Sequence, residues 1–147
     1  MPLLDQLTSD MKAAMKARDS ATLSTVRMLI SDLKNIRIDR GRDLDDQEAI
    51  AFLSTQAKRR RESIAAYEKA EREDLAQVER TDLAVIERYL PEQLDVDEVR
   101  DILRAVIEET GATSMKEMGK VMGAAMPRLR GRFPGGEVKN LVMELLK

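Results

Sequence analysis

The sequence predicts an all-α protein, and three observations lead to that class. Aromatic residues make up 3% of the 147 residues and charged residues 35%, a composition typical of helices that pack through Leu, Ile, Val, Met and Ala rather than of a β-sandwich. Apolar residues recur every three or four positions over most of the chain, which is the period of an amphipathic helix. Glycine occurs once in the first 110 residues, at Gly41, and is frequent afterwards. We therefore expect two parts that are built differently.

Four helices are expected in the first part. Their apolar repeats run from Leu4 to Met15, from Leu23 to Leu33, from Ile50 to Tyr67 and from Leu75 to Leu90. A break near Arg18 to Ser20 separates the first two repeats, and a loop around Gly41 ends the second. Asp45 or Asp46 can cap the third helix, which is expected to be the longest. The third and fourth helices are expected to form a long hairpin that turns near Glu71 to Glu73.

The chain is expected to divide at Pro91, because the residue before a proline is pushed out of the helical region. The prediction is an N-terminal helical domain over residues 1–90 and a C-terminal three-helix domain over residues 91–147. Asp95 with Glu98, and again Ser114 with Glu117, are capping-box patterns that predict the starts of the fifth and sixth helices. A seventh helix is expected after Pro134, Gly135 and Gly136.

The composition argues against catalysis by this chain alone. It contains neither histidine nor cysteine, so the usual general base, the commonest metal ligands and any thiol nucleophile are missing. Glycine-rich motifs that hold nucleotide phosphates are also absent. We expect no catalytic residues, no metal and no cofactor. The absence of cysteine is compatible with the cytoplasm, and no apolar run approaches the length of a membrane span, so no membrane partner is expected.

The densest basic run, residues 58–61, is expected to serve two purposes. In a helical projection Lys58 and Arg59 point away from the apolar stripe, whereas Arg60 and Arg61 fall on its edges. Glu79 and Asp82 lie within the stripe of the fourth helix. We predict that Arg60 and Arg61 pair with these acids across the hairpin, Arg61 with Asp82, and that Lys58 and Arg59 form a secondary basic surface or simply a solvated one.

A second group of basic residues lies near the C-terminus. Seven of the last 37 residues are basic and three are acidic, although the net charge of the chain is −2. A local excess of this kind suggests a surface for a polyanion such as RNA phosphate. Gly119 and Gly123 would let either a ligand backbone or a neighbouring helix approach closely. Four aromatic residues are too few for platforms that stack single-stranded bases, so the RNA is expected to be folded rather than single-stranded. No DNA partner is expected.

Two long segments carry a resemblance to a known family. They read RRRESIAAYEKAEREDLAQVERTDLAVIERYLPEQL and SMKEMGKVMGAAMPRLRG. Both resemble the GatB/YqeY family, and the similarity extends over nearly the whole chain. It implies an all-helical protein whose C-terminal domain is similar to the tail of GatB, the tRNA-dependent amidotransferase subunit. The chain departs from the family pattern at the turn formed by Phe133, Pro134, Gly135 and Gly136, where we expect a rigid turn that presents Phe133.

The resemblance also implies a function. The expected function is that of a non-catalytic tRNA-associated module that assists aminoacyl-tRNA amidation or aminoacylation in trans, with tRNA and a glutaminyl-tRNA synthetase or amidotransferase as partners. The tail positions that match, and that are predicted to contact RNA, are Lys116, Lys120, Arg128, Arg130, Arg132 and Lys139. The alternative is a helical protein-interaction adaptor that uses the face formed by Met115, Met118, Met122 and Met126; as a plain core stripe, the same methionines would have no such role.

Overall fold

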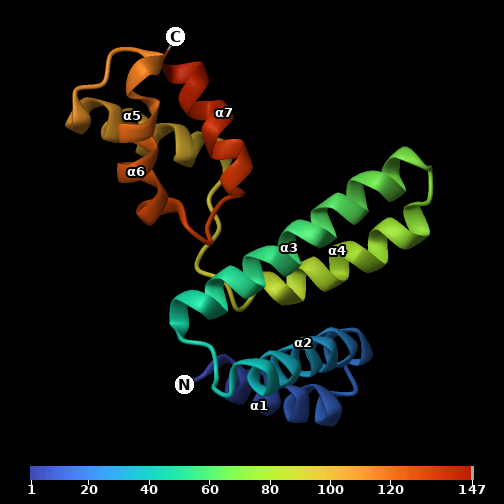
Figure 1. Ribbon diagram of the computed structural model, residues 1–147. Coiled ribbons are helices and arrows are strands. Elements are labelled where there is room, and N and C mark those ends of the chain that lie inside the picture. The colour runs from blue at the N-terminus through green and yellow to red at the C-terminus, as the bar shows by residue number, and fades with distance from the viewer. Residues whose placement is uncertain (147) are drawn as a thin grey trace. The chain divides into compact units, whose positions relative to one another are not determined.

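The computed structural model describes residues 1–146 and confirms the all-α class. Within these residues it contains α-helices, one short 3₁₀ turn and no strand (Figure 1). The elements are α1 (Leu3–Ala17), α2 (Ser20–Arg40), α3 (Asp46–Lys69), α4 (Glu73–Glu87), α5 (Val96–Thr110), η1 (Met115–Glu117), α6 (Met118–Leu129) and α7 (Gly135–Leu145). The chain divides into two compact units, the first from Met1 to Leu90 and the second beginning at Pro91.

The first unit is held together by apolar side chains from its four helices. α1 packs along α2, α3 and α4 form a long antiparallel hairpin, and α2 also packs against α4 (Figure 1). Leu7, Val26, Leu29, Ala57 and Ile86 are completely buried. Because burial of a side chain the size of leucine contributes about 1.5 to 3 kcal/mol, this core fixes how the hairpin sits on α1 and α2.

The breaks between the helices of the first unit have local causes. Arg18 ends α1 in the left-handed region, with φ at 56°, and the Asp19 carboxylate caps α2 by accepting a hydrogen bond from the Thr22 amide at 3.2 Å. A hydrogen bond from the Thr22 hydroxyl, at 2.7 Å, and the one from the Thr22 amide lower the pKa of Asp19. At the tip of the hairpin, Glu71 also adopts a positive φ, of 59°. The predicted break and the predicted hairpin turn are therefore confirmed.

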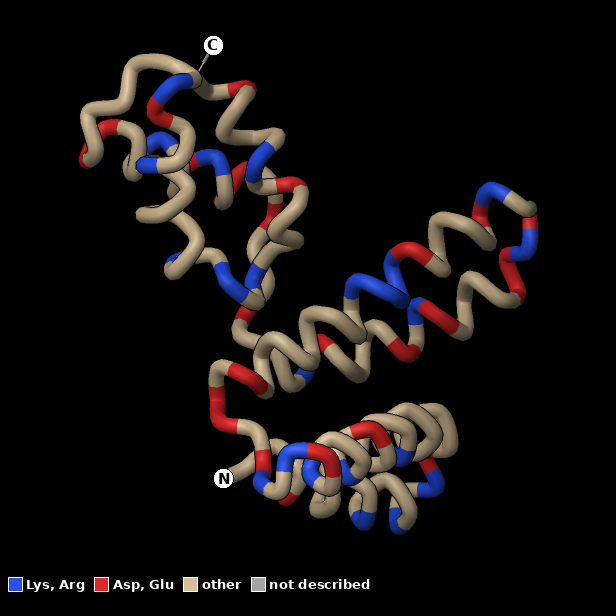
Figure 2. The backbone as a smooth tube through the Cα atoms, in the orientation of Figure 1, with Lys and Arg blue, Asp and Glu red and all other residues tan. Residues whose placement is uncertain are grey.

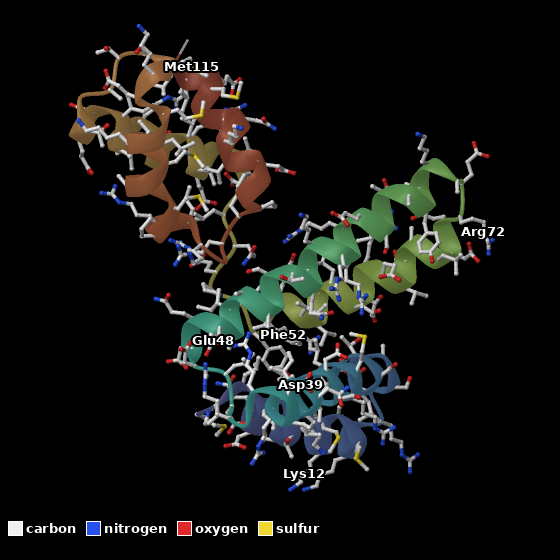
Figure 3. The ribbon with its side chains drawn as sticks, viewed as in Figure 1. Lys12, Asp39, Glu48, Phe52, Arg72 and Met115 are labelled. Atoms are coloured by element: carbon white, nitrogen blue, oxygen red, sulfur yellow. The ribbon has the colours of Figure 1, made fainter. Side chains whose placement is uncertain are left out.

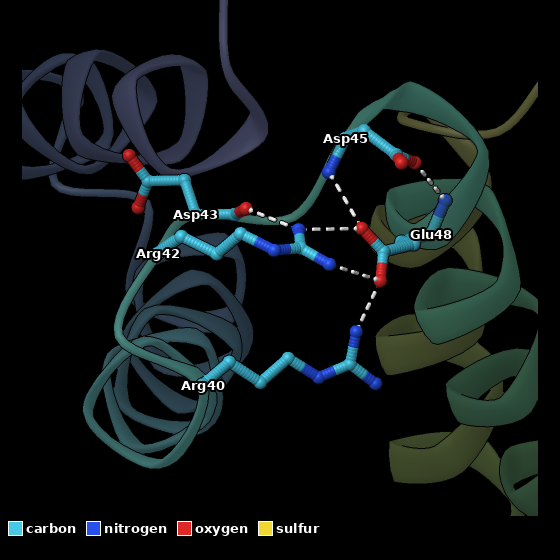
Figure 4. A network of polar contacts seen from close by, with 5 residues as sticks. All are labelled: Arg40, Arg42, Asp43, Asp45 and Glu48. Atoms are coloured by element: carbon cyan, nitrogen blue, oxygen red, sulfur yellow. Dashed lines mark hydrogen bonds and ion pairs between the residues drawn. The ribbon is translucent and has the colours of Figure 1, made fainter.

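The corner between α2 and α3 is fastened by Glu48. Asp45, rather than Asp46, is the N-cap of α3, and it forms a full capping box with Glu48. The Glu48 carboxylate also accepts hydrogen bonds from Arg40 and Arg42 (Figure 4). The hydrogen bond from Arg42 and the amide of Asp45 lower the pKa of Glu48 to about 2. One acid therefore joins the end of α2, the connecting loop and the first turn of α3.

Glu48→Gln is expected to destabilise the protein in a pH-dependent way. The folded-state pKa is about 2, below the ordinary value of 4.5, so the stabilisation is fully present above the ordinary value and disappears as the pH falls toward the lower one. Unfolding by urea across this range should show wild type more stable above about pH 5 and nearly equal to the variant near about pH 2. Glu62→Gln, an exposed acid on the same helix, is the control. A Glu48→Gln difference that does not change with pH would contradict the assignment.

The basic run on α3 is divided as predicted, but its pairing differs. The Arg60 Nε lies 3.5 Å from Glu79 Oε2 and 3.6 Å from Asp82 Oδ2, and the Thr25 hydroxyl donates a hydrogen bond to Asp82 at 2.8 Å. Arg61 pairs instead with Glu87, at 3.3 Å. The predicted pairing of Arg61 with Asp82 is wrong, because Arg60 faces α2 and α4 whereas Arg61, one residue further around α3, reaches only the edge of the interface.

The second unit packs around α5, α6 and α7. Its core is formed by buried residues of these helices, among them Val99, Leu103, Val121, Ala125 and Val142. The predicted capping box at Asp95 and Glu98 is present at the start of α5. Within the described residues, no helix combines the length and the apolar character that a membrane crossing requires.

Two helix boundaries differ from the prediction. The Ser114 side chain does not cap the sixth helix; residues 115–117 form the 3₁₀ turn η1, and α6 begins at Met118. The fourth helix ends at Glu87, three residues before the predicted end at Leu90. Short 3₁₀ turns, with hydrogen bonds between residues three apart, are common at helix ends. A capping pattern in the sequence does not distinguish such a turn from the first turn of an α-helix.

Candidate nucleic-acid interface

One face of α6 carries almost no side chains. Gly119, Gly123 and Pro127 are exposed, whereas Val121, Ala125 and Leu129 on the opposite face are fully buried. A Cβ atom added at Gly119 or Gly123 would meet no neighbouring atom within 4 Å. Close packing inside the described unit therefore does not account for these glycines.

Exposed basic residues stand before, on and after α6. Lys116 stands in η1 before α6, Lys120 lies on α6 beside the glycines, and Arg130 follows the end of the helix; all three are exposed. None of them forms an ion pair with another residue of the described chain. We call Lys116, Gly119, Lys120, Gly123, Pro127 and Arg130 the α6 strip. At about 1.5 Å per residue the strip extends for roughly 20 Å.

Arg128 is placed differently. It points about 100° away from Pro127 around the helix, and its guanidinium donates a hydrogen bond to Glu109 on α5 at 2.6 Å. The expectation of a basic group with few acids nearby is therefore not met at this residue. Its charge is largely neutralised, and its contact joins α5 to α6.

Arg132 fastens the turn after α6 to the start of the second unit. Its Nε donates to the Glu92 carbonyl at 3.0 Å, and its own carbonyl accepts a hydrogen bond from the Leu94 amide at 2.9 Å. Gln93 donates to the Gly131 carbonyl at 2.6 Å. Phe133 is partly buried against the core of the unit, so the turn does not present its ring to solvent as expected. The Arg132 and Phe133 side chains therefore hold the turn in place.

The remaining candidate cations lie elsewhere. Lys139 is exposed on α7, and Lys58 and Arg59 are exposed on α3 in the first unit. Charges of both signs are interspersed along the α3–α4 hairpin (Figure 2). The structure thus leaves Lys116, Lys120 and Arg130 exposed on or next to α6 and without an ion pair among the described residues, whereas Arg128 and Arg132 make contacts of their own.

The methionines of the sixth helix contribute mainly to the core. Met118, Met122 and Met126 are partly buried and pack against the core of the second unit. Met115 lies in η1 and is 40% exposed (Figure 3). The plain core role weighed from the sequence therefore describes three of these four methionines.

Sequence reasoning did not single out Pro127 as part of the candidate surface. A proline has no N–H, so Pro127 cannot donate the usual hydrogen bond to the Gly123 carbonyl four residues before it. The Gly123 carbonyl therefore lacks the hydrogen bond that it would usually accept from residue 127. The signal in the sequence was the spacing of Gly119, Gly123 and Pro127, which are four residues apart.

The fold and the charge pattern define an all-helical protein in two units, the second of which is small and carries a cationic strip. The chain belongs to the YqeY-like protein family, whose family model matches residues 4–146. This confirms the family resemblance inferred from the sequence.

Several fungal proteins with the name "altered inheritance of mitochondria protein 41, mitochondrial" are similar to this chain. The one from Meyerozyma guilliermondii is 32% identical over 146 residues, which cover 90% of this chain and 76% of that protein. The one from Kluyveromyces lactis is 32% identical over 130 residues, covering 82% of this chain and 70% of that protein. The one from Saccharomyces cerevisiae is 26% identical over 151 residues, covering 96% and 81%. These names place the relatives in mitochondria.

Proposed function

We propose that this protein is a non-catalytic tRNA-associated module that assists aminoacyl-tRNA amidation or aminoacylation in trans. The observation that carries the proposal is the α6 strip, in which unpaired cations accompany exposed backbone that no part of the described unit covers. The similarity to the GatB tail noted from the sequence supports tRNA as the particular RNA. The chain's enzyme partner is then a glutaminyl-tRNA synthetase or an amidotransferase.

The strip suits a phosphate backbone for two physical reasons. Lysine and arginine that neutralise phosphates release condensed counterions, which gives affinity without sequence specificity. Glycine has no side chain, so a ribose-phosphate chain can approach the surface of α6 closely. Base stacking is not needed, because double-helical RNA is contacted through its shape, its phosphates and its 2′-hydroxyls.

We propose RNA as the nucleic acid and no DNA partner, because the similarity to the GatB tail noted from the sequence points to tRNA. Double-helical RNA presents 2′-hydroxyls as well as phosphates to a protein surface, and a DNA strand has no 2′-hydroxyl.

The location follows from the partner. We propose the cytoplasm for this chain, a reducing compartment compatible with its lack of cysteine. The similar fungal proteins carry mitochondrial names, and tRNA is aminoacylated in both compartments. The proposed interaction with tRNA is therefore the same in either compartment.

The proposal is tested first by binding of fluorescently labelled unfractionated tRNA at two salt concentrations. Wild type should bind, and its affinity should fall steeply as the salt rises. A DNA hairpin of tRNA-like length should bind more weakly at each salt concentration. Absence of tRNA binding at low salt and high protein concentration would refute the proposal. The adaptor alternative, through the exposed Met115 side chain, would then take its place, with salt-insensitive binding to a protein as its signature.

A second test uses the glycines of the strip. Gly119→Ala with Gly123→Ala should stabilise the protein, by about 1 kcal/mol at Gly123 and by less in the first turn at Gly119, because alanine favours a helix and both added methyl groups have open space. The same double variant should bind tRNA about 10-fold more weakly, since the methyl groups hold the RNA backbone away. Thermal unfolding and tRNA titration measure the two effects. Higher stability with unchanged affinity would show that RNA does not approach this face.

A further inference from the structure

A cavity of about 500 Å³ lies between α2 and α3 in the first unit. The two helices are joined at both of its ends. At one end the Arg40 guanidinium donates a hydrogen bond to Glu48 (Figure 4), and at the other the Arg60 guanidinium donates to the Met28 sulfur at 2.8 Å. The cavity is therefore bounded along the helices. Its volume lies within the range of about 300 to 1,000 Å³ that is typical of sites for small molecules.

The two contacts also set the register of the helices. They are twelve residues apart on each helix, from Met28 to Arg40 on α2 and from Glu48 to Arg60 on α3, which is about 18 Å. Every residue of α2 and α3 that lines the cavity lies within these two stretches. Because the stretches run in opposite directions, Ile36 and Phe52 lie at about the same level, near the middle of the cavity.

The middle of the cavity is aromatic and apolar. Phe52 lines it and is also packed against the core of the first unit, and its ring lies in the space between α3 and α2 (Figure 3). Ile36 and Leu44 add apolar surface to the lining. An aromatic side chain held in place by a core favours a ligand that contains a flat ring, because two rings pack with a specific and favourable geometry.

Two primary amides line the same cavity. Gln56 follows Phe52 by one turn of α3 and is 6% exposed, and Asn35 lies on α2. Neither side chain makes a hydrogen bond to another residue of the part of the chain that the structure describes. The Gln56 amide is not sealed inside the protein, so the cavity gives access to it. A primary amide carries a donor beside an acceptor, and adenine presents the complementary pair on its edge.

A cation lies beyond the amides. Arg59 lines the cavity, is exposed and forms no ion pair with a residue between positions 1 and 146. It follows Phe52 by seven residues, or about 10 Å along α3. A ligand that reaches both residues needs a flat ring at one end and an anion at the other. The chain has no glycine-rich phosphate motif, so a side chain such as Arg59 would have to hold a phosphate.

From these observations we infer that the cavity between α2 and α3 binds an adenine nucleotide. The adenine ring packs against Phe52 and is hydrogen-bonded by the Gln56 and Asn35 amides. Arg59 binds the phosphate. Asp32, which also lines the cavity, accepts hydrogen bonds from the ribose hydroxyls, as acidic residues do in other nucleotide sites. This site lies in the first unit and does not rest on the tRNA proposal.

The test is isothermal titration calorimetry of the full chain with four small ligands. Adenosine 5′-monophosphate should bind about 10-fold more tightly than the guanosine and cytidine monophosphates, because only adenine matches the amides. Adenosine without its phosphate should also bind about 10-fold more weakly. A short single-stranded oligoadenylate distinguishes two sources of the same chemistry. Tighter binding than the mononucleotide indicates an unpaired adenosine of RNA, and weaker binding indicates the free nucleotide.

Two variants separate the ring from the phosphate. Gln56→Leu should abolish the preference for adenine over guanine. It should retain the fold, because leucine has a similar volume and position 56 belongs to the apolar stripe of α3 with Leu53 and Ala57. Arg59→Met should weaken binding of adenosine 5′-monophosphate about 10-fold and leave the affinity for adenosine unchanged. Lys58→Met is the matched control, since Lys58 does not line the cavity, and should change neither affinity. Circular dichroism would verify that each variant is folded.

Three results would overturn the inference. The first is no binding of adenosine 5′-monophosphate at millimolar concentration. The second is equal binding of all three nucleotides by the wild type. The third is binding that neither Gln56→Leu nor Arg59→Met alters, which would place the nucleotide elsewhere on the protein. Charge reversal on the α6 strip should not affect nucleotide binding, so failure of either proposal leaves the other intact.

Discussion

Arg60→Met is expected to lower the free energy of unfolding by about 2 to 3 kcal/mol. The Arg60 side chain is 16% exposed and those of Glu79 and Asp82 are 19% and 25% exposed, so removal of the guanidinium leaves two acids close together and largely desolvated. Arg60 Nε and Glu79 Oε2 form an ion pair and not a hydrogen bond, and within the described residues each is buried with no hydrogen-bond partner. The pair is therefore held by charge, and loss of one member is not compensated.

Urea-induced unfolding would measure the effect of Arg60→Met. Arg59→Met, on the adjacent exposed residue, should change the stability by less than about 0.5 kcal/mol. Arg60→Met combined with Glu79→Met should recover part of the loss, because apolar side chains of similar volume replace a buried ion pair with little penalty. Equal effects of Arg60→Met and Arg59→Met would show that the charge cluster does not contribute to stability.

Charge reversal on the α6 strip is expected to have the largest effect on RNA binding. A variant with Lys116, Lys120 and Arg130 all replaced by glutamate should bind tRNA about 100-fold more weakly at moderate salt. The slope of log affinity against log salt concentration should become shallower by about 2 to 3, because each lost phosphate contact reduces it by about one. All three residues are exposed, so the fold should be retained.

A variant with the same change in net charge separates local from global electrostatics. Replacement of Lys12, Lys16 and Lys34, which are exposed on α1 and α2, by glutamate should reduce affinity only slightly and leave the salt dependence nearly unchanged. Equal losses of affinity in the two triple variants would mean that tRNA binding depends on the net charge of the protein. The α6 strip would then not be the interface. Arg128→Glu should act mainly on stability, through the lost pair with Glu109.

The order and type of the helices were predictable because each depends on residues close in sequence. Apolar residues at helical spacing, the Asp45 and Asp95 caps and the break at Arg18 act within one or two turns. Boundaries were predicted less well where two local solutions compete, as at Ser114, where a 3₁₀ turn replaces the expected first turn of the helix. The family membership was also accessible from the sequence, because it rests on long ordered segments of residues.

The partners of the charged residues were decided by the tertiary structure. The sequence showed that Arg60 and Arg61 face inward, but the rotation of α3 on α2 and α4 determines that Arg60 meets Glu79 and Asp82 while Arg61 meets Glu87. Likewise, the sequence grouped Arg128 and Arg132 with the other C-terminal cations. Packing of α5 against α6 pairs Arg128 with Glu109, and the turn after α6 directs Arg132 to the Glu92 carbonyl.

The sequence by itself determined the helices, their caps, the excess of basic residues near the C-terminus and the family. Only the tertiary structure decided which cations of the α6 strip remain without an ion pair and which are paired. The physical reason is the range over which each effect acts. Helical periodicity and capping operate over a few residues, whereas the pairing of a charge depends on how helices distant in sequence are packed by the core of a whole unit.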